Sequence, residues 1–588
     1  MKYPKLRVIG SSRQIVDEFK GYNHNLRIGA GEFFDMKNMT SNYYPVLSPR
    51  GKRGVYVKDG SYYGMIAKDS LCYVKGTQFF INKNPVDGLV LTERQKQLIS
   101  MGAYVIIMPD KKWVNTKDLT YGDIEASFEA TSARYAMCKA DSTEYGDIHQ
   151  SATPPDPEEH DMWIDTSVSP HALKQYSKSS SVWNQVATTY VRISAPNIAE
   201  NFSQYDAVKI SGLPPQLADM NDTTVVLWDA YHDPGDEKLS RIEGTNDYIV
   251  IVGILDEVMT YESTLSLART MPEMDFIIEA NNRLWGCRYG PAANGEIVNE
   301  IYCSKLGDFK NWNCFMGIST DSWVGSCGTD GQWTGAITHM GYPLFFKENY
   351  LHKVYGNMPS NFQVQTTPCV GVQKDCEKSL AIVNTTLFYK GRSGVCAYDG
   401  SLPIEISYPL GNEVYSKAVG GAIGNKYYVS MNDAYEKRHL FVFDVSKSMW
   451  HREDDIPVEE FCSCRGELYA IANGEIITML GSDTPDTSHV EWMVETGEIG
   501  ISSPDSKYIS RLTLRMAMDF GSEIVIYASY DFNDAWEQVC VLTGDSLRTF
   551  SIPIRPKRCD YMKLRIEGVG AAKIYSITKT IEQGSELS

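Results

Sequence analysis

Short apolar runs separated by tight turns dominate the stretch from residue 274 to 480. Each run leads through a two-residue turn into an aromatic-rich run that returns. Five such pairs lie at residues 276–285, 344–351, 381–389, 422–429 and 461–470. Asn and Gly occupy many of the turns, and both tolerate the positive φ that a two-residue hairpin requires. The pattern therefore predicts a series of β-hairpins.

The hairpins recur roughly every 35–60 residues, which is the spacing expected of propeller blades. A blade exposes apolar faces that it cannot bury alone, so blades stack around a common axis. Similar hairpin patterns occur at residues 71–81 and 97–114, before a long interruption. We therefore predict one β-propeller with its first blades in residues 61–119 and its remaining blades in residues 271–482.

Residues 120–270 interrupt the propeller pattern and predict an inserted small β-domain. A Pro- and acid-rich stretch at residues 152–159 favours a loop. Three short runs around Trp163 and Trp183 predict a small sheet. Four further runs between residues 190 and 254, each of about 4–6 residues and separated by turn residues, are typical of a small barrel or sandwich.

The two ends of the chain have different patterns. Residues 1–60 predict an N-terminal lead-in or arm with a few short strands. Residues 483–588 follow a Gly-, Ser- and Pro-containing linker and alternate apolar with polar positions, which predicts a β-sandwich. Hardly any segment has a 3.6-residue period. The predicted fold class is therefore all-β: a β-propeller interrupted by a small β insertion and followed by a C-terminal β-sandwich.

Charge and hydropathy narrow the range of partners. The formal net charge of −18 argues against wide contact with nucleic acid or an anionic membrane. No apolar run approaches the ~20 residues that a membrane helix needs. The first ten residues contain no apolar region of a signal peptide, so we expect synthesis in the cytoplasm without classical export.

The polar and sulfur-containing residues indicate neither a metal site nor a cofactor. The 13 Cys residues are scattered without a C-x-x-C pair, which favours free, buried thiols. An acidic loop at residues 231–237 has oxygen ligands of the kind that calcium prefers. Its spacing matches no known calcium loop, so a solvated turn is the favoured interpretation.

The sequence also lacks the common catalytic motifs. It contains no G-x-S-x-G, phosphate-binding loop or H-E-x-x-H motif. Residues 319–323 and 329–333 are fragments of the Asp-box of propeller sialidases, and neither keeps both the Gly and the Trp spacing. A glycosidase further requires a positioned pair of carboxylates. We expect a protein that is not an enzyme, with a propeller hydrolase as an alternative.

A basic cluster stands out in this acidic chain. Arg50, Lys52 and Arg53 follow a loop that Pro45 and Pro49 hold extended. A solvated loop and a contact with a partner are both open interpretations. Burying these cations without partners would be prohibitive. We therefore predict an exposed assembly contact that meets an acidic face of a neighbouring subunit.

Two regions resemble a known family. Residues 31–39 with 43–50, and the segment Ile301-Tyr302-Cys303-Ser304-Lys305-Leu306-Gly307-Asp308-Phe309-Lys310-Asn311-Trp312-Asn313, resemble bacteriophage tail stabilisation or tail-hub proteins, which are associated with the head–tail connector. Residues 395–400 and 441–444 are similar to the propeller of those proteins. The likeness covers about half of the chain.

The resemblance implies a structural protein of the virion tail, assembled in the cytoplasm of the bacterial host. Such a protein would form a homo-oligomeric ring that contacts the portal, an adaptor or other tail proteins. It would close the head–tail channel or dock appendages such as a fibre or spike. The alternative is a tail-tip or receptor-binding protein whose inserted domain holds a host glycan, with Trp163 and Trp183 stacking on sugar rings. Core packing is the commoner role of such tryptophans.

Overall fold

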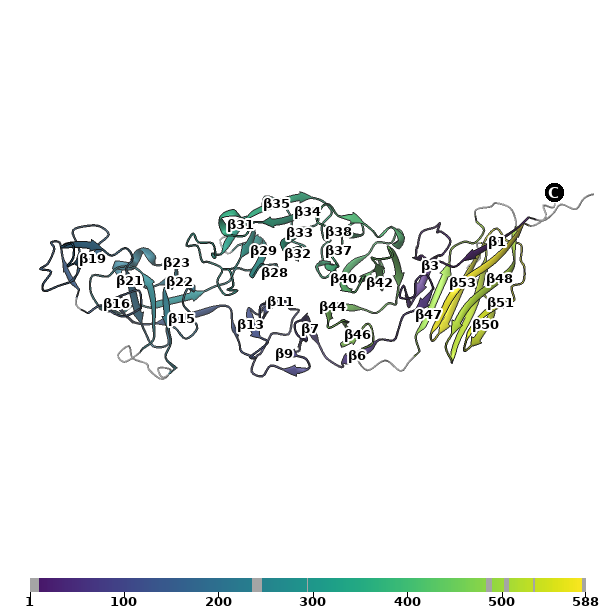
Figure 1. Cartoon of the computed structure of the whole chain (residues 1–588), viewed down its shortest axis with the longest axis horizontal. Coiled ribbons are helices and arrows are strands. Elements are labelled where there is room, and N and C mark those ends of the chain that lie inside the picture. The colour runs from purple at the N-terminus through teal and green to yellow at the C-terminus, as the bar shows by residue number, and fades with distance from the viewer. Residues whose placement is uncertain are drawn as a thin grey trace, which may run out of the picture.

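The computed structural model describes residues 10–146, 148–234, 246–292, 295–482, 489–501, 507–531 and 535–583. The molecule is elongated, with an inserted domain at one end, a propeller in the middle and a sandwich at the other end (Figure 1). This confirms the predicted fold class, because nearly every regular element is a β-strand. Among the described helices, none has the length and apolar character needed to cross a membrane.

The propeller contains seven four-stranded antiparallel sheets in the described residues, which begin at β7, β11, β28, β32, β36, β40 and β44. The two blades before the insertion contain β7 (Tyr62–Ala67), β8 (Leu71–Lys75), β9 (Gln78–Ile81), β10 (Asn84–Pro85), β11 (Gln97–Met101), β12 (Tyr104–Met108), β13 (Lys112–Asn115) and β14 (Tyr121–Asp123). The next two contain β28 (Phe276–Ala280), β29 (Arg283–Pro291), β30 (Ile297–Cys303), β31 (Trp323–Ser326), β32 (Gly335–His339), β33 (Tyr342–Lys347), β34 (Tyr350–Tyr355) and β35 (Gln363–Pro368).

The remaining blades complete the ring. They contain β36 (Ala381–Val383), β37 (Thr386–Lys390), β38 (Val395–Tyr398), β39 (Ile404–Glu405), β40 (Ser416–Ile423), β41 (Lys426–Asn432), β42 (Arg438–Asp444), β43 (Met449–Arg452), β44 (Val458–Cys464), β45 (Glu467–Ala472), β46 (Glu475–Thr478) and β6 (Gly54–Val57). Three short 3₁₀ helices lie in the connections, namely η3 (Pro359–Asn361), η4 (Glu377–Ser379) and η5 (Tyr408–Leu410). The hairpin turns have the positive φ predicted for them, for example Asn384 at 56° and Gly424 at 55°.

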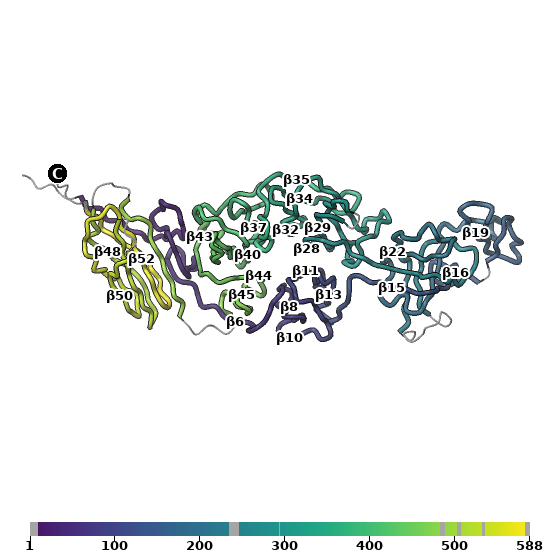
Figure 2. The backbone as a smooth tube through the Cα atoms, turned by 180° about the vertical axis from the view of Figure 1, so that it is seen from behind, coloured from purple at the N-terminus to yellow at the C-terminus, as the bar shows by residue number. Residues whose placement is uncertain are grey.

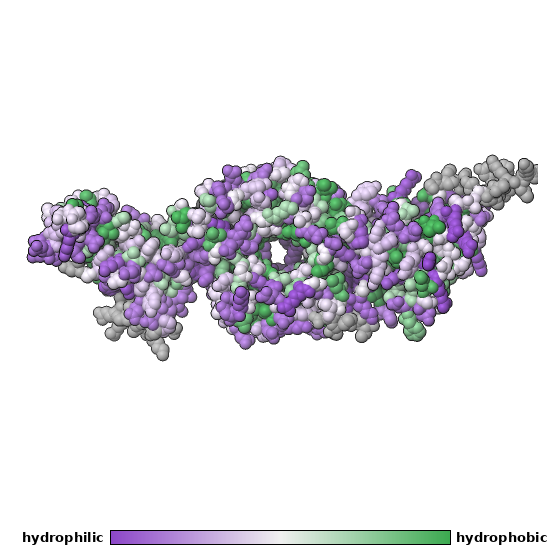
Figure 3. All heavy atoms as spheres, in the orientation of Figure 1, coloured by the Kyte–Doolittle hydropathy of each residue, from purple (hydrophilic) through white to green (hydrophobic). Residues whose placement is uncertain are grey.

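The first strand of each blade lies innermost, since β40 packs on β44, β44 on β7, and β7 on β11. An opening remains at the centre of the ring (Figure 3). The ring is closed by strands from both ends of the propeller sequence. β6 pairs antiparallel with β46, with Val55 opposite Ile477 and Gly54 opposite Thr478. In both backbone views β6 lies beside the last blade (Figure 1 and Figure 2). The first and last parts of the propeller therefore share one blade, in which β6 is the outermost strand.

The lead-in or arm predicted for residues 1–60 is not a unit of its own, because the sandwich and the propeller share its described part, residues 10–60. One sandwich sheet has the order β1 (Ser11–Val16), β53 (Ala572–Gln583), β48 (Lys507–Met518) and β51 (Leu547–Ile552). The other has the order β2 (Gly21–Tyr22), β3 (Glu32–Lys37), β47 (Glu491–Thr496), β52 (Met562–Val569), β49 (Ser522–Tyr530) and β50 (Glu537–Gly544). A short pair, β4 (Met39–Thr40) and β5 (Ser48–Pro49), leads from the sandwich towards β6.

The core of the sandwich continues into the propeller. Leu514 and Ile566 from the two sandwich sheets belong to the same cluster of buried side chains as Met36 and Trp450. β2 packs directly on β43 of the propeller. The sandwich and the propeller therefore bury apolar surface against each other, which restrains their relative orientation.

The inserted domain leaves the propeller after β14 and returns before β28. Its first and last strands pair with each other, with Ala126 opposite Arg269. Its described residues form three sheets and one 3₁₀ helix, η1 (Pro215–Met220). The first sheet contains β15 (Ala126–Ala130), β27 (Leu265–Arg269), β22 (Ala207–Ser211) and β23 (Thr223–Val226), and the second contains β24 (Asp229–Tyr231), β25 (Tyr248–Val252), β21 (Tyr190–Ser194), β16 (Ala133–Cys138) and β26 (Met259–Tyr261). The third contains β17 (His149–Ser151), β18 (Met162–Asp165), β19 (Ala172–Ser177) and β20 (Val182–Gln185).

Candidate functional site

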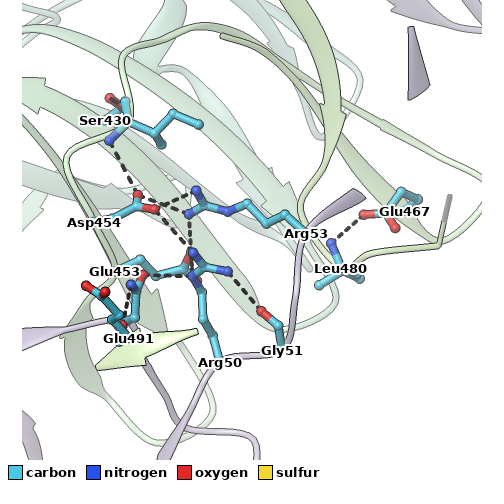
Figure 4. Close-up of polar contacts among 11 residues, drawn as sticks. Arg50, Gly51, Arg53, Ser430, Glu453, Asp454, Glu467, Leu480 and Glu491 are labelled. Atoms are coloured by element: carbon cyan, nitrogen blue, oxygen red, sulfur yellow. Dashed lines mark hydrogen bonds and ion pairs between the residues drawn. The ribbon is translucent and has the colours of Figure 1, made fainter. Parts of the chain in front are cut away.

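The predicted basic contact lies inside the molecule. The side chains of Arg50 and Arg53 are only 13% and 11% exposed, and both face the carboxylates that follow β43 (Figure 4). Arg53 donates hydrogen bonds to Glu453 and to Asp454, each at 2.7 Å. Arg50 lies 3.6 Å from Glu453 and 3.3 Å from Asp454. The prediction of an exposed assembly contact is therefore wrong for both arginines, because two carboxylates of the same chain neutralise them.

The electrostatics of this four-residue cluster follow from its burial. Burial by itself would raise the pKa of Asp454, but Arg53 and Arg50 outweigh this effect and hold that pKa below its usual value. Burial lowers the pKa of Arg50, and the nearby Arg53 lowers it further. Lys52, the third cation of the predicted contact, is partly buried and has interactions of its own.

The cluster also connects three parts of the fold. Arg50 Nε donates to the side-chain oxygen of Asn38, and the backbone N–H of Asn38 donates to the carbonyl of Glu453. The side-chain amide of Asn38 donates to the carbonyl of Glu491, the first residue of β47. The N-terminal segment, the propeller and the sandwich therefore meet at one hydrogen-bonded joint, which we call the sandwich joint.

The two tryptophans of the inserted domain do not form an open platform for a sugar. Trp163 on β18 is 3% exposed, and its indole N–H donates to the carbonyl of Ser151 at 2.9 Å. Trp183 on β20 is partly buried and meets Trp163 edge to face, with ring centroids 5.5 Å apart. The predicted stacking pair is wrong for Trp163, because its ring faces are covered by protein, including Lys174 Nζ at 4.8 Å.

A joint at the opposite end of the propeller attaches the insertion. Asn311 is fully buried, and its amide donates to Asp206 at 2.8 Å and to Asp308 at 2.6 Å. Its side-chain oxygen accepts the backbone N–H of Ala207 at 2.7 Å. Arg269 pairs with the same Asp206. We call this group the insertion joint. Sequence reasoning did not predict its role, although Asn311 lies in a segment that carries the family resemblance.

The interior of the propeller ring contains a further contact between distant segments. Lys378 of η4 donates to Glu460 at 3.0 Å and to the side chain of Gln95 at 3.2 Å. Gln95 precedes β11, Lys378 precedes β36, and Glu460 lies in β44. These strands belong to the second, fifth and last blades, so the contact spans the inside of the ring. Glu460 also accepts the backbone N–H of Met65 at 2.7 Å.

The titratable groups do not identify a catalytic centre among the described residues. Where the pKa of a described carboxyl departs from its usual value, the shift is downward, as at Asp165, whose pKa is lowered to about 2 by hydrogen bonds from Lys174 and Ser167. No group of three or more His, Cys, Asp or Glu among the described residues is placed to hold a metal ion. Residues 235–237 of the acidic loop considered for calcium lie outside the described residues.

Comparisons with known proteins give only distant likenesses. No family model matches the sequence, and no curated protein matches it. A solved exo-β-1,3-galactanase from Phanerochaete chrysosporium has 9% identity over 52% of this chain and 94% of its own, with a TM-score of 0.20. An engineered GH43 glycoside hydrolase with endo-xylanase and exo-arabinofuranosidase activity has 10% identity over 52% of this chain and 96% of its own, with a TM-score of 0.21.

A third solved structure covers more of the chain. A surface component of the type-IX secretion system of Porphyromonas gingivalis has 10% identity over 84% of this chain and 70% of its own, with a TM-score of 0.25. The expectation that this protein is not an enzyme is corrected by these findings, since solved structures similar to it include glycoside hydrolases. At such identities the likeness concerns the fold, and it assigns no substrate to this chain.

Proposed function

We propose that this chain is a structural protein of a bacteriophage tail, of the tail-hub or stabilisation type. In this proposal the propeller is a rigid centre that holds two β-domains at opposite ends. Each end offers a surface to neighbouring virion proteins, which include further copies of the chain, the portal or an adaptor, and appendages such as a fibre.

One observation carries the proposal. Two of the segments that resemble tail-hub proteins each contribute residues to one of the two joints. Residues 31–39 and 43–50 include Asn38 and Arg50 of the sandwich joint, and residues 301–313 include Asn311 of the insertion joint. The resemblance therefore falls on residues that fix how the three bodies are connected, which is the property that a structural connector needs.

The charges of the joints support a mechanical role. At the sandwich joint two arginines face two carboxylates, and at the insertion joint Arg269 faces Asp206. Both sets are largely buried, so they are weakly screened by salt and hold their geometry at the ionic strength of the cell. Since Arg50 and Arg53 form ion pairs within the chain, contacts between copies must use other surfaces.

The proposal is tested on intact particles. Antibodies raised against the purified chain are applied to virions from a culture that produces it, and gold-labelled antibodies are located by electron microscopy. We expect label at one pole of the particle, on the tail, and no label after the antibodies are absorbed with the purified chain. Unlabelled particles, or label spread over the capsid, would contradict the proposal. The glycan-receptor alternative receives no support from the buried Trp163.

A further inference from the structure

The sandwich contains a cleft of about 560 Å³ between its two sheets. Its inner wall is apolar and includes Phe19, Phe33, Leu564 and Ile577, all of which are buried. Polar residues of β1 form part of its rim. A volume of roughly 300–1,000 Å³ with apolar walls is typical of sites for small molecules.

One cation points into this apolar cleft. Ile577, Lys579 and Ile581 alternate along β53 and all line the cleft, so Lys579 occupies an inward position between two isoleucines. Its backbone lies opposite Gln14 of β1 on one side and Leu512 of β48 on the other. Among the residues that the structure describes, no carboxylate forms an ion pair with Lys579. Burial lowers the pKa of its ammonium group, and no nearby charge offsets that effect.

The other charged side chains that line the cleft are Lys507, which already has hydrogen-bond partners, and two carboxylates. Lys507 donates to the carbonyl of Asp560 and lies 3.5 Å from its carboxylate. Glu32 accepts hydrogen bonds from Asn23 and from the backbone N–H of Gly29. Glu498 also lines the cleft. The cleft therefore has one cation without an acidic partner among the described residues, and its remaining carboxylates disfavour a second negative charge.

An inward-facing lysine can also serve to protect a sheet edge from pairing with other chains. That role does not fit Lys579, because β53 is an interior strand with β1 and β48 on its two sides. The side chain of Lys579 is partly buried, and desolvation of an ammonium group without an acidic partner is costly. An anionic ligand would remove this cost, and a ligand with an apolar body would cover the inner wall.

We propose that the cleft binds a small amphipathic molecule with an aliphatic body and a single carboxylate. The carboxylate accepts a hydrogen bond from Lys579 Nζ, and the aliphatic body lies between the sheets against Leu564 and Ile577. This site is separate from both joints and goes beyond the proposed tail function.

The test uses the full chain and decanoate as the probe, with decanol and decyltrimethylammonium as comparators, in calorimetric titrations. We expect decanoate to bind roughly tenfold or more tightly than decanol, because a charge-assisted hydrogen bond is added to the same apolar contact. The cationic comparator should not compete. Lys579→Met should abolish the preference for decanoate but retain decanol binding. Lys573→Met is the control, since Lys573 lies on the same strand outside the cleft, over the ring of Tyr43.

The pH dependence gives a second readout. The pKa of Lys579 is lowered from the usual value of lysine. Decanoate affinity should therefore fall as the pH rises through this lowered pKa, while decanol affinity stays constant. Equal affinities for decanoate and decanol, a preference that survives in Lys579→Met, or no binding of either compound would each overturn the proposal. Binding seen only after removal of residues 1–9 would identify the chain's own N-terminus as the occupant and would equally overturn it.

Discussion

Replacing Arg53 by methionine should destabilise the folded chain, because it leaves buried negative charge without its best partner. Arg53 donates to both Glu453 and Asp454, whose side chains are 5% and 20% exposed. Methionine keeps most of the apolar volume of the arginine but removes its charge and its hydrogen bonds. The cluster then changes from two cations and two anions to one cation and two anions.

The size of the effect follows from the burial. Removing one partner of a buried ion pair costs ~3–5 kcal/mol, because the remaining charge stays desolvated. Arg50 remains within 3.6 Å of Glu453 and within 3.3 Å of Asp454, so it keeps part of the compensation. We therefore expect a loss of about 3 kcal/mol, at the lower end of that range. For a body of this size that corresponds to roughly 6 °C or less in Tm.

Unfolding by guanidinium chloride, followed by tryptophan fluorescence, measures the loss alongside the melting temperature. Arg94→Met is the matched control, since Arg94 lies in the same propeller with a 56% exposed side chain, 3.8 Å from Asp110. Its change should stay below ~1 kcal/mol. Adding Asp454→Asn to Arg53→Met restores the charge balance and should recover part of the stability.

The cluster also predicts a dependence on pH. The pKa of Asp454 is held below its usual value in the folded chain. The ionised carboxylate therefore stabilises the folded chain above the unfolded pKa of about 3.9, and this stabilisation is lost as the pH falls through the folded pKa. The stability difference between the wild type and Asp454→Asn should therefore shrink below about pH 4. If the Arg53→Met variant has the melting temperature of the wild type but fails to assemble, this reasoning is refuted. The interpretation of Arg53 as an exposed assembly contact would then be restored.

Three further outcomes are expected. Deleting residues 126–269 with a short Gly-Ser linker should leave a soluble protein with a cooperative transition, because Ala126 and Arg269 are paired neighbours; an unfolded product would contradict a self-contained propeller. Burial, with Lys347 nearby, lowers the pKa of His352 to about 4, so the folded chain should lose up to about 3 kcal/mol as the pH falls from about 6.5 to about 4. His352→Gln should remove that part of the pH profile. Thiol titration of the unfolded chain without reductant should find all 13 cysteines free, and a lower count would show a disulfide.

Local patterns predicted the fold class because hairpins depend on neighbouring residues. The turn at Asn384 and the flanking apolar runs lie within a few residues, so the period-two alternation and the turn chemistry were sufficient. The closure of the ring was not predictable in this way. β6 pairs with β46 more than 400 residues away, and a four-residue strand near the N-terminus carries no local sign of that partner.

For the basic cluster, a correct physical rule led to a wrong prediction of where the two arginines lie. Burying Arg50 and Arg53 without partners is indeed prohibitive, and residues 36–58 around them contain no acidic residue. Their partners, Glu453 and Asp454, are brought to them only because β43 of the propeller packs beside the N-terminal strands β2 and β4. Lys579 presents the opposite case: alternation along β53 turns it towards the cleft, where it is partly buried and no described carboxylate forms an ion pair with it. The same rule that explains the paired arginines therefore points to a ligand as the missing partner of Lys579.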